Sequence, residues 1–227
     1  GQYRTNEEHI VSGMFGREKI HYIAPSPERV DEEMAHFLDW FNRQENVNSV
    51  IRSAIAHFWF VCIHPFEDGN GRLARILSDM LLARTDKSEF RFYNISSQIN
   101  KDKKRYYDML EKAQHGDGDL TEWIGWYART LSVALDEAEN IVSTTLNKSF
   151  FWQKVSSVPL SQRQTDMLNL FLDGYEAKIT SKTWASLAHC SKDTAIRDIQ
   201  DLVEKEILRE DIPGAKRPSY SIIYDPE

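Results

Sequence analysis

The 227-residue sequence is poor in cysteine, in long hydrophobic runs and in net positive charge. Its two cysteines, Cys62 and Cys190, are far apart in the chain, which argues against a disulfide framework and favours a reduced, cytoplasmic protein. The longest apolar run, IAHFWFVCI at 55–63, contains a histidine and is too short to cross a bilayer, so no membrane association is expected. The formal net charge of −7 argues against a protein that coats nucleic acid through a generally basic surface.

What is present is the composition of an ordinary globular protein, long enough for a substantial core. β-forming residues around two glycines predict a short hairpin at about 9–24. Ser26 is a plausible N-cap and Pro27 a good first residue for the helix that follows. Hydrophobic periodicity predicts helices in the first part of the chain at 26–42, 48–63, 72–85, 100–114 and 120–146.

The helical pattern is expected to break around 147–158, before Pro159. We therefore predict a first domain at 1–150 and a second at 157–227. The second domain has the pattern of three helices and then two strands around the turn PGAKRP at 213–218. This order is typical of a winged helix-turn-helix.

One segment, HPFEDGNGRLAR at 64–75, combines residues with complementary chemistry. Arg72 and Arg75 stand at the start of a predicted helix, where the helix dipole already favours anions over cations. The loop Gly69–Gly71 and the unpaired N–H groups of the following helix can hold an anion. Because residues three apart share a helix face, the two guanidinium groups can clamp neighbouring phosphates of one ligand.

Three further residues of the segment complete this interpretation. Asp68 would repel a bound polyphosphate unless a divalent cation, most simply Mg²⁺, lies between them. His64 has a near-neutral pKa and can accept a proton from a hydroxyl that attacks phosphorus, and Phe66 is expected to anchor the loop. Each residue alone has an ordinary structural explanation, but together they favour nucleotide-dependent phosphoryl or nucleotidyl transfer. The lysine and Ser/Thr of a Walker A loop are missing.

The segment resembles the signature of the Fic (filamentation induced by cAMP) family, His-x-Phe-x-Asp/Glu-Gly-Asn-Gly-Arg-x-x-Arg, at all eight specified positions. The resemblance extends over about residues 1–145. It implies a mainly α fold, in which a Fic-type helical bundle with a small β-hairpin flap precedes a C-terminal winged helix-turn-helix, as in bacterial members. It also implies a protein adenylyltransferase, which transfers AMP from ATP to a Ser, Thr or Tyr hydroxyl of a target protein and releases pyrophosphate, with Mg²⁺ as cofactor.

The resemblance also assigns roles to residues. It implies that His64 is the catalytic base and Asp68 the metal ligand. The residues that it implies for nucleotide binding are Gly69, Asn70, Gly71, Arg72, Arg75, Tyr106 and Tyr107. Related Doc kinases have lysine where this sequence has Gly71, so the resemblance favours AMP transfer over phosphate transfer.

Two of these regions also have simpler explanations. Tyr106 and Tyr107 lie where the family lines its adenine pocket, although aromatic residues on an amphipathic helix often belong to the core. Met14 and Phe15 are implied to lie in the flap, which would bind the target segment as an added strand, whereas a plain edge hairpin is the alternative.

The sequence leaves several alternatives open for how the protein is regulated and what it binds. The sequence has no Ser/Thr-x-x-x-Glu-Gly/Asn pattern, so the family's inhibitory helix is expected on a preceding segment or on an antitoxin-like partner. A homodimer also fits. Between Lys182 and Arg217, seven Lys/Arg balance seven Asp/Glu, so DNA binding and protein docking are equal alternatives for the winged helix. A nucleotide-sensing transcription regulator and an enzyme that removes AMP are the alternative functions.

Overall fold

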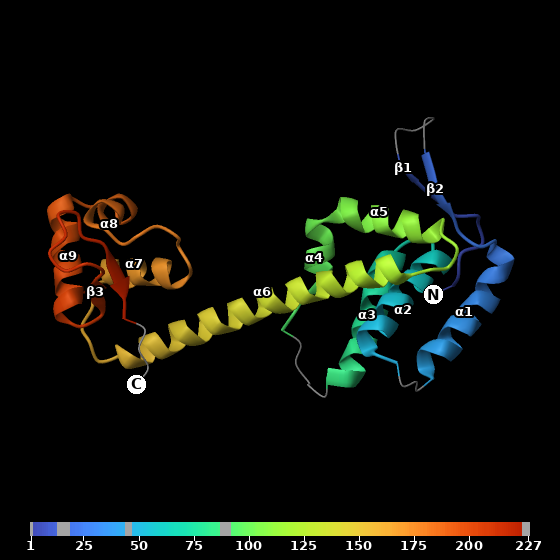
Figure 1. Ribbon diagram of the computed structural model, residues 1–227, viewed down its shortest axis with the longest axis horizontal. Helices are drawn as coiled ribbons and strands as arrows, with labels where there is room; N and C mark the ends of the chain where they lie inside the picture. Colours follow the sequence, from blue (N-terminus) through green and yellow to red (C-terminus); the bar gives the residue numbers. More distant parts are fainter. Residues whose placement is uncertain (1, 13–18, 44–46, 87–91, 224–227) are drawn as a thin grey trace. The chain divides into compact units, whose positions relative to one another are not determined.

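The chain folds into two compact units in a computed structural model (Figure 1). The structure describes residues 2–12, 19–43, 47–86 and 92–223. The first unit comprises 1–138 and the second 139–227, and helix α6 (Thr121–Lys154) contributes to both. Each unit has its own hydrophobic core.

The first unit is a helical bundle with one small hairpin. Strands β1 (His9–Ser12) and β2 (Lys19–Ile23) pair in antiparallel register, with an irregularity between Ile10 and Val11. The helices that follow are α1 (Pro27–Asn42), α2 (Ser49–Ile63), α3 (Asn70–Asp86), α4 (Ile95–Lys101), α5 (Lys103–Gln114) and the first part of α6. The prediction of a mainly helical fold with small hairpins is confirmed.

Helix α2 is the centre of this bundle because it is apolar on most of its surface. It packs against α1 and α3, and its buried residues include Ala54, Phe60 and Ile63. The indole Nε1 of Trp123 in α6 donates a hydrogen bond to the carbonyl oxygen of Ala54 at 2.8 Å. These contacts hold the C-terminal end of α2, where the motif at 64–75 begins.

The helix predicted at 100–114 is divided at Asp102. This residue ends α4 as its C-cap and begins α5 as its N-cap, where its side chain accepts a hydrogen bond from the Arg105 N–H at 3.3 Å. Most of the seven-residue α4 was therefore not predicted, because a single short helix has little periodicity.

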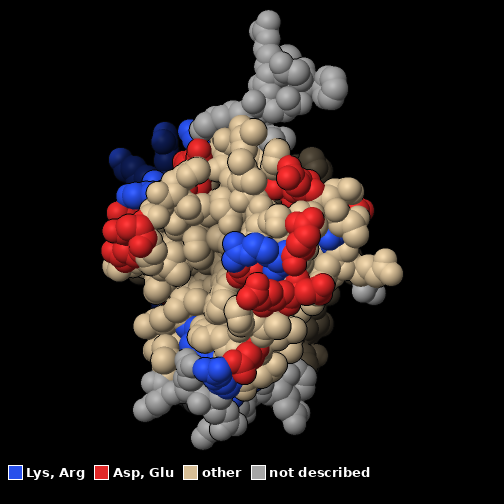
Figure 2. Space-filling view, turned by 90° about the vertical axis from the view of Figure 1, so that its right-hand side faces the viewer, with Lys and Arg blue, Asp and Glu red and all other residues tan. Residues whose placement is uncertain are grey.

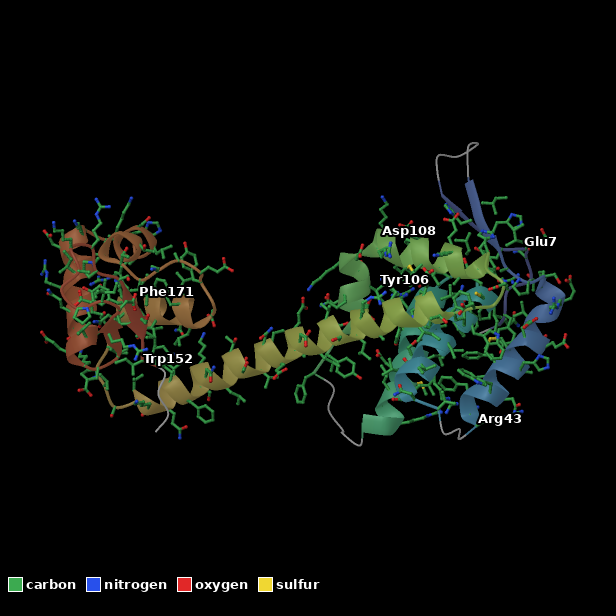
Figure 3. The ribbon with its side chains drawn as sticks, in the orientation of Figure 1. Glu7, Arg43, Tyr106, Asp108, Trp152 and Phe171 are labelled. Carbon is green, nitrogen blue, oxygen red and sulfur yellow. The ribbon has the colours of Figure 1, made fainter. Side chains whose placement is uncertain are left out.

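The second unit contains three helices and a two-stranded hairpin in the predicted order. They are α7 (Gln162–Leu172), α8 (Ser181–Leu187), α9 (Lys192–Glu204), β3 (Leu208–Glu210) and β4 (Tyr220–Ile222). A bridge between Ile179 and Tyr220 extends the hairpin by one pair. Trp184 is fully buried, and its ring stacks on that of Phe171, which Figure 3 labels on α7.

Helix α6 is longer than the sequence suggested. It was expected to end near 146, whereas it continues to Lys154. No glycine or proline interrupts residues 126–158, and Phe151 and Val155 near its end are buried in the core of the second unit. Packing therefore extends the helix beyond the point where its polar sequence predicted a break.

The surface carries no large region of one charge on the face seen in Figure 2, where acidic and basic side chains lie side by side. Within the part of the chain that the structure describes, no helix is long and apolar enough to span a bilayer.

Candidate functional site

His64 lies at the sharp turn that ends helix α2. It is the C-cap residue, with φ 49° and ψ 56°, a left-handed conformation that is uncommon for residues other than glycine and frequent at functional sites. Its Nδ1 lies 3.3 Å from the carbonyl oxygen of Val61. Because that oxygen can only accept, the hydrogen bond places the proton on Nδ1 and leaves Nε2 with a free lone pair.

The environment of His64 also favours its neutral form. The residue is half-buried, and burial lowers the pKa of its imidazole below the ordinary value. A neutral ring with a free Nε2 is the form that can act as a general base.

Arg4 holds the backbone of this turn. Its side chain is 3% exposed, and its Nε donates to the carbonyl oxygen of His64 at 2.7 Å. The other guanidinium nitrogens donate to the carbonyl oxygens of Asn6 at 2.9 Å, Pro25 at 2.5 Å and Ile63 at 3.4 Å. The Arg4 backbone N–H donates to the carbonyl oxygen of Pro65 at 2.9 Å. Sequence reasoning missed Arg4, because nothing in local periodicity pairs it with a residue sixty positions away.

The glycine loop is closed by Asn70, which is 2% exposed. Its Oδ1 accepts from the Phe66 N–H at 3.0 Å, and its Nδ2 donates to the Phe66 carbonyl oxygen at 2.6 Å. The side chain of Asn70 is therefore already hydrogen-bonded within the loop, so this residue would bind an anion through its backbone N–H. Helix α3 begins at Asn70, so the N–H groups of its first turn have no acceptor inside the helix.

The two motif arginines differ in their surroundings. Arg72 is exposed and lies 3.4 Å from Asp68, a solvent-exposed ion pair of little strength. Arg75 is half-buried and has neither a hydrogen bond nor an ion pair with any of the described residues. A Cβ added to Gly71 would lie 3.6 Å from Nη1 of Arg75, an ordinary van der Waals contact, so a side chain at position 71 would lie beside that guanidinium group.

These residues line a cavity of about 610 Å³, a size common for binding sites of small ligands. The sequence-predicted residues in its lining are His64, Asp68, Gly69, Asn70, Gly71, Arg72, Arg75, Tyr106 and Tyr107. The structure thus brings together every predicted site residue that it describes. Met14 and Phe15 lie outside the described residues.

The cavity also has lining residues that the sequence did not indicate. Helix α4 contributes Ser96, Ser97 and Asn100, and the start of α5 contributes a third cation, Lys103. Their hydroxyl, amide and ammonium groups are suited to polar parts of a ligand. Ser96 and Ser97 were missed because no helix was predicted at 95–99. Asn100 and Lys103 lie in the helix predicted at 100–114, but nothing in its pattern marked them as lining residues.

The two tyrosines of α5 have different environments. Tyr106 is 6% exposed, and its hydroxyl lies 3.0 Å from Nε2 of the buried His57. Figure 3 shows Tyr106 below α5, toward the bundle, whereas Asp108 lies on the opposite side of the helix. Tyr107 is 57% exposed and therefore has ring surface free for a ligand. Tyr106 is a fixed wall of the cavity, and Tyr107 is the better stacking partner.

A second cavity of about 580 Å³ adjoins the first and shares His64, Arg75 and both tyrosines with it. It extends between the hairpin and α5, where Ile10 and Leu110 are among its lining residues. His64 therefore faces two compartments, one polar and cationic and the other more apolar.

The residues present fit a metal ion that is shared with a ligand. Among the described residues, no group of three or more His, Cys, Asp or Glu side chains could hold a metal by itself. Asp68 is exposed in the polar cavity, and Mg²⁺ at nucleotide sites is commonly bound by one or two carboxylates together with phosphates.

Parts of the chain are similar to known proteins. Residues 1–82 match the model of the Fic/DOC family. A protein adenylyltransferase Fic from Nematostella vectensis is 33% identical over 148 residues, which are 64% of this chain and 30% of that protein. Protein adenylyltransferase fic-1 from Caenorhabditis elegans is 42% identical over 87 residues, which are 37% of this chain and 15% of that protein. The chain thus spans less than a third of the length of these relatives.

The fold is also found in a solved structure. A Fic family protein from Desulfovibrio desulfuricans G20 aligns with the whole of this chain and 63% of its own, with a TM-score of 0.52 at 22% identity. The range that matches the family model includes the whole motif at 64–75 and also Arg4. Over residues 1–82, the chain is thus similar to proteins of the Fic/DOC family.

Proposed function

We propose that the chain is a protein adenylyltransferase, which transfers AMP from ATP to a Ser, Thr or Tyr hydroxyl of a target protein and releases pyrophosphate. The observation that carries the proposal is Arg75, a half-buried guanidinium group without a partner among the described residues, in the same cavity as the free Nε2 of His64. A half-buried cation without a partner is stabilised when an anionic ligand binds to it. A neutral imidazole in the same cavity can accept the proton of an attacking nucleophile.

The polar cavity would hold the nucleotide. The phosphates would lie against the backbone N–H groups at the start of α3, with Arg72 and Arg75 on their oxygens. Asp68 would hold Mg²⁺, which when bound neutralises and orients the phosphates. The exposed ring of Tyr107 is suited to stack on the adenine base.

The reaction would need one proton transfer and one displacement at phosphorus. Nε2 of His64 accepts the proton of the target hydroxyl while its oxygen bonds to the α-phosphorus. The bond between the α-phosphorus and the oxygen that bridges to the β-phosphorus breaks, and pyrophosphate leaves with that electron pair. The guanidinium groups of Arg72 and Arg75 stabilise the negative charge that the leaving group gains.

The second cavity would receive the target. It lies beside β1 and β2 and opens to His64, so a target segment that adds to the hairpin as a strand would bring its hydroxyl near Nε2. Met14 and Phe15 remain proposed contacts of this segment. A glutamate from an inhibitory helix or an antitoxin-like partner would compete for Arg75 and so restrain the enzyme.

We also propose that the second unit is a winged helix-turn-helix of the type that follows the Fic core in bacterial proteins. Its order of α7, α8, α9, β3 and β4, together with the bridge between Ile179 and Tyr220, supports this assignment. Cys62 and Cys190 are free thiols, which supports the proposal that the protein acts in the reducing cytoplasm.

Transfer of label from ATP tests the proposed function. The chain is incubated with Mg²⁺, target lysate and ATP labelled either at the α- or at the γ-phosphate. The His64→Ala variant should lose about 10²- to 10⁴-fold in the rate of α-label transfer, with ATP affinity in calorimetry little changed. His36→Ala, which removes an exposed histidine of α1, is the matched control. Transfer of the γ-label instead, or full activity of His64→Ala, would contradict the proposal.

A further inference from the structure

The second unit contains a cavity of about 690 Å³ that the proposed transfer reaction does not use. Its walls come from the start of α8, from one side of α9 and from the loop between β3 and β4. The lining includes four cations and no carboxylate: Lys182, Lys192, Lys216 and Arg217. We call this surface the basic groove.

The four cations of the basic groove are free to bind a ligand. All four are exposed, and none has an ion pair within 4.0 Å of a carboxylate in the described residues. Elsewhere in the same unit, lysines and arginines do pair, as Lys148 does with Asp173 at 2.6 Å. The basic groove therefore keeps unneutralised positive charge from three separate elements.

Two of the acidic residues that balance the positive charge in the sequence, Asp198 and Asp201, do not line the basic groove. Asp198 is 8% exposed and accepts two hydrogen bonds from Arg163, at 2.6 and 2.8 Å, and one from the Trp184 indole at 3.2 Å. Asp201 accepts from Gln164 at 2.7 Å and from Lys205 at 2.6 Å. These carboxylates are thus neutralised by partners from α7, α8 and the end of α9, away from the groove.

Two other carboxylates, Asp211 and Asp193, do not line the groove. Asp211 accepts from the hydroxyls of Ser219 and Ser221, each at 2.5 Å, within the β3–β4 hairpin. Asp193 is exposed in the first turn of α9 but does not line the groove. The equal numbers of acids and bases in the sequence therefore hide a separation of charge in space.

We propose that the basic groove binds the backbone of duplex DNA, with α9 in the major groove and the β3–β4 loop on adjacent phosphates. Lys192, Ile196 and Gln200 are spaced four apart on α9 and all line the groove, so they present one face of a helix. A helix about 10–12 Å across fits a major groove about 12 Å wide. Lys216 and Arg217 from the loop then reach the phosphates on one side of α9, and Lys182 extends the contact along α8.

The lining also distinguishes duplex DNA from other polyanions. The amide of Gln200 can pair with the N6 and N7 atoms of adenine, and Ile196 can contact a thymine methyl group, both of which are reached from the major groove. The major groove of duplex RNA is too narrow for a helix. Among the described residues that line the groove, Tyr220 is the one aromatic residue, whereas single strands are commonly bound by several rings on which successive bases stack.

Titration of the intact chain with a duplex of about 20 base pairs, over a range of salt concentrations, tests the proposal. Four phosphate contacts predict a slope of log K against log salt of about −3.6, which is about a hundredfold loss of affinity between about 50 and 200 mM salt. In Lys216→Ala/Arg217→Ala the slope should fall to about −1.8. Arg29→Ala/Arg43→Ala, which removes two exposed cations of the first unit, should keep the full slope.

A second control separates the basic groove from the cationic cavity of the first unit. Arg72→Ala/Arg75→Ala should bind the duplex as the unchanged chain does. The proposal is overturned if Arg72→Ala/Arg75→Ala loses affinity for the duplex. It is also overturned if Lys216→Ala/Arg217→Ala keeps the affinity and the salt dependence of the unchanged chain. It is also overturned if the chain binds no duplex at about 50 mM salt, or binds the single strand or duplex RNA more tightly than duplex DNA.

Discussion

At the scale of single residues, the site depends on contacts that hold its chemical groups in place. Arg4 does not line the cavity, but its guanidinium group donates hydrogen bonds to four backbone carbonyls of the first unit, among them that of His64. The left-handed conformation of His64 is costly for a residue with a Cβ, so the surrounding hydrogen bonds must maintain it. Arg4 is therefore a positioning residue for the proposed base.

We predict that Arg4→Lys lowers kcat for AMP transfer by about 10- to 10²-fold, because a small displacement of a catalytic group is enough for such a loss. A lysine keeps the charge but cannot donate to all four carbonyls at once. KM for ATP should change little. Arg29→Lys, at an exposed site of α1, is the control. Unchanged kcat in Arg4→Lys would contradict the positioning role, and a lower melting temperature with normal kcat would show a purely structural one.

The buried His57 predicts how stability depends on pH. Burial lowers its pKa to about 3, and its Nδ1 has no hydrogen-bond partner among the residues that the structure describes. Above pH 6.5 the ring is neutral in both the folded and the unfolded chain and has no effect. Between pH 6.5 and 3 only the unfolded chain takes up the proton, so the free energy of unfolding falls by up to about 1.4 kcal/mol per pH unit.

Urea unfolding at several pH values measures this effect. The His57→Gln variant, whose amide can still reach the Tyr106 hydroxyl, should show a weaker loss of stability between pH 6 and 4 than the unchanged chain. His36→Ala, at an exposed site, should keep the full pH dependence. An equal slope in all three proteins would contradict the assignment to His57.

At the scale of elements, the sequence predicts features that depend on neighbouring residues and misses those that depend on contacts between distant segments. The motif at 64–75 and the helices that flank it follow from spacing and charge, because these depend on residues a few positions apart. Arg4 was missed because its partners lie in other segments, and the extension of α6 was missed because it depends on packing in the second unit. The balance of charge in the second unit was misleading for the same reason, since only the fold separates Asp198 from the basic groove.

The loop between α2 and α3 shows how one side chain can hold an element. Asn70 replaces the hydrogen bonds that the Phe66 backbone would otherwise make with water. We predict that Asn70→Ala lowers the free energy of unfolding by about 2 kcal/mol, because both backbone groups lose their partner in a half-buried loop. Urea unfolding measures this change in the free energy of unfolding, and Asn42→Ala, which alters an exposed residue, is the control. Equal stability of the two variants would show that the loop is held by other contacts.

At the scale of the whole molecule, each unit has its own core and its own cavity lined by cations, and helix α6 contributes to both units. The proposed nucleotide site is built only from residues of the first unit, and the basic groove only from residues of the second. A ligand that binds only the folded form of a unit stabilises that unit by mass action.

This separation predicts a unit-specific response to ligand. Mg²⁺ with ATP at about 100 times its dissociation constant should stabilise the first unit by about 2.7 kcal/mol. Amide hydrogen exchange should show greater protection in α2, α3 and α5, because these helices surround the cavity. Exchange in α7 and α9 should be unchanged, since their core shares no residue with the first. Equal protection of both units would show instead that the continuous helix α6 couples their stabilities, whereas no protection in either would contradict the nucleotide site.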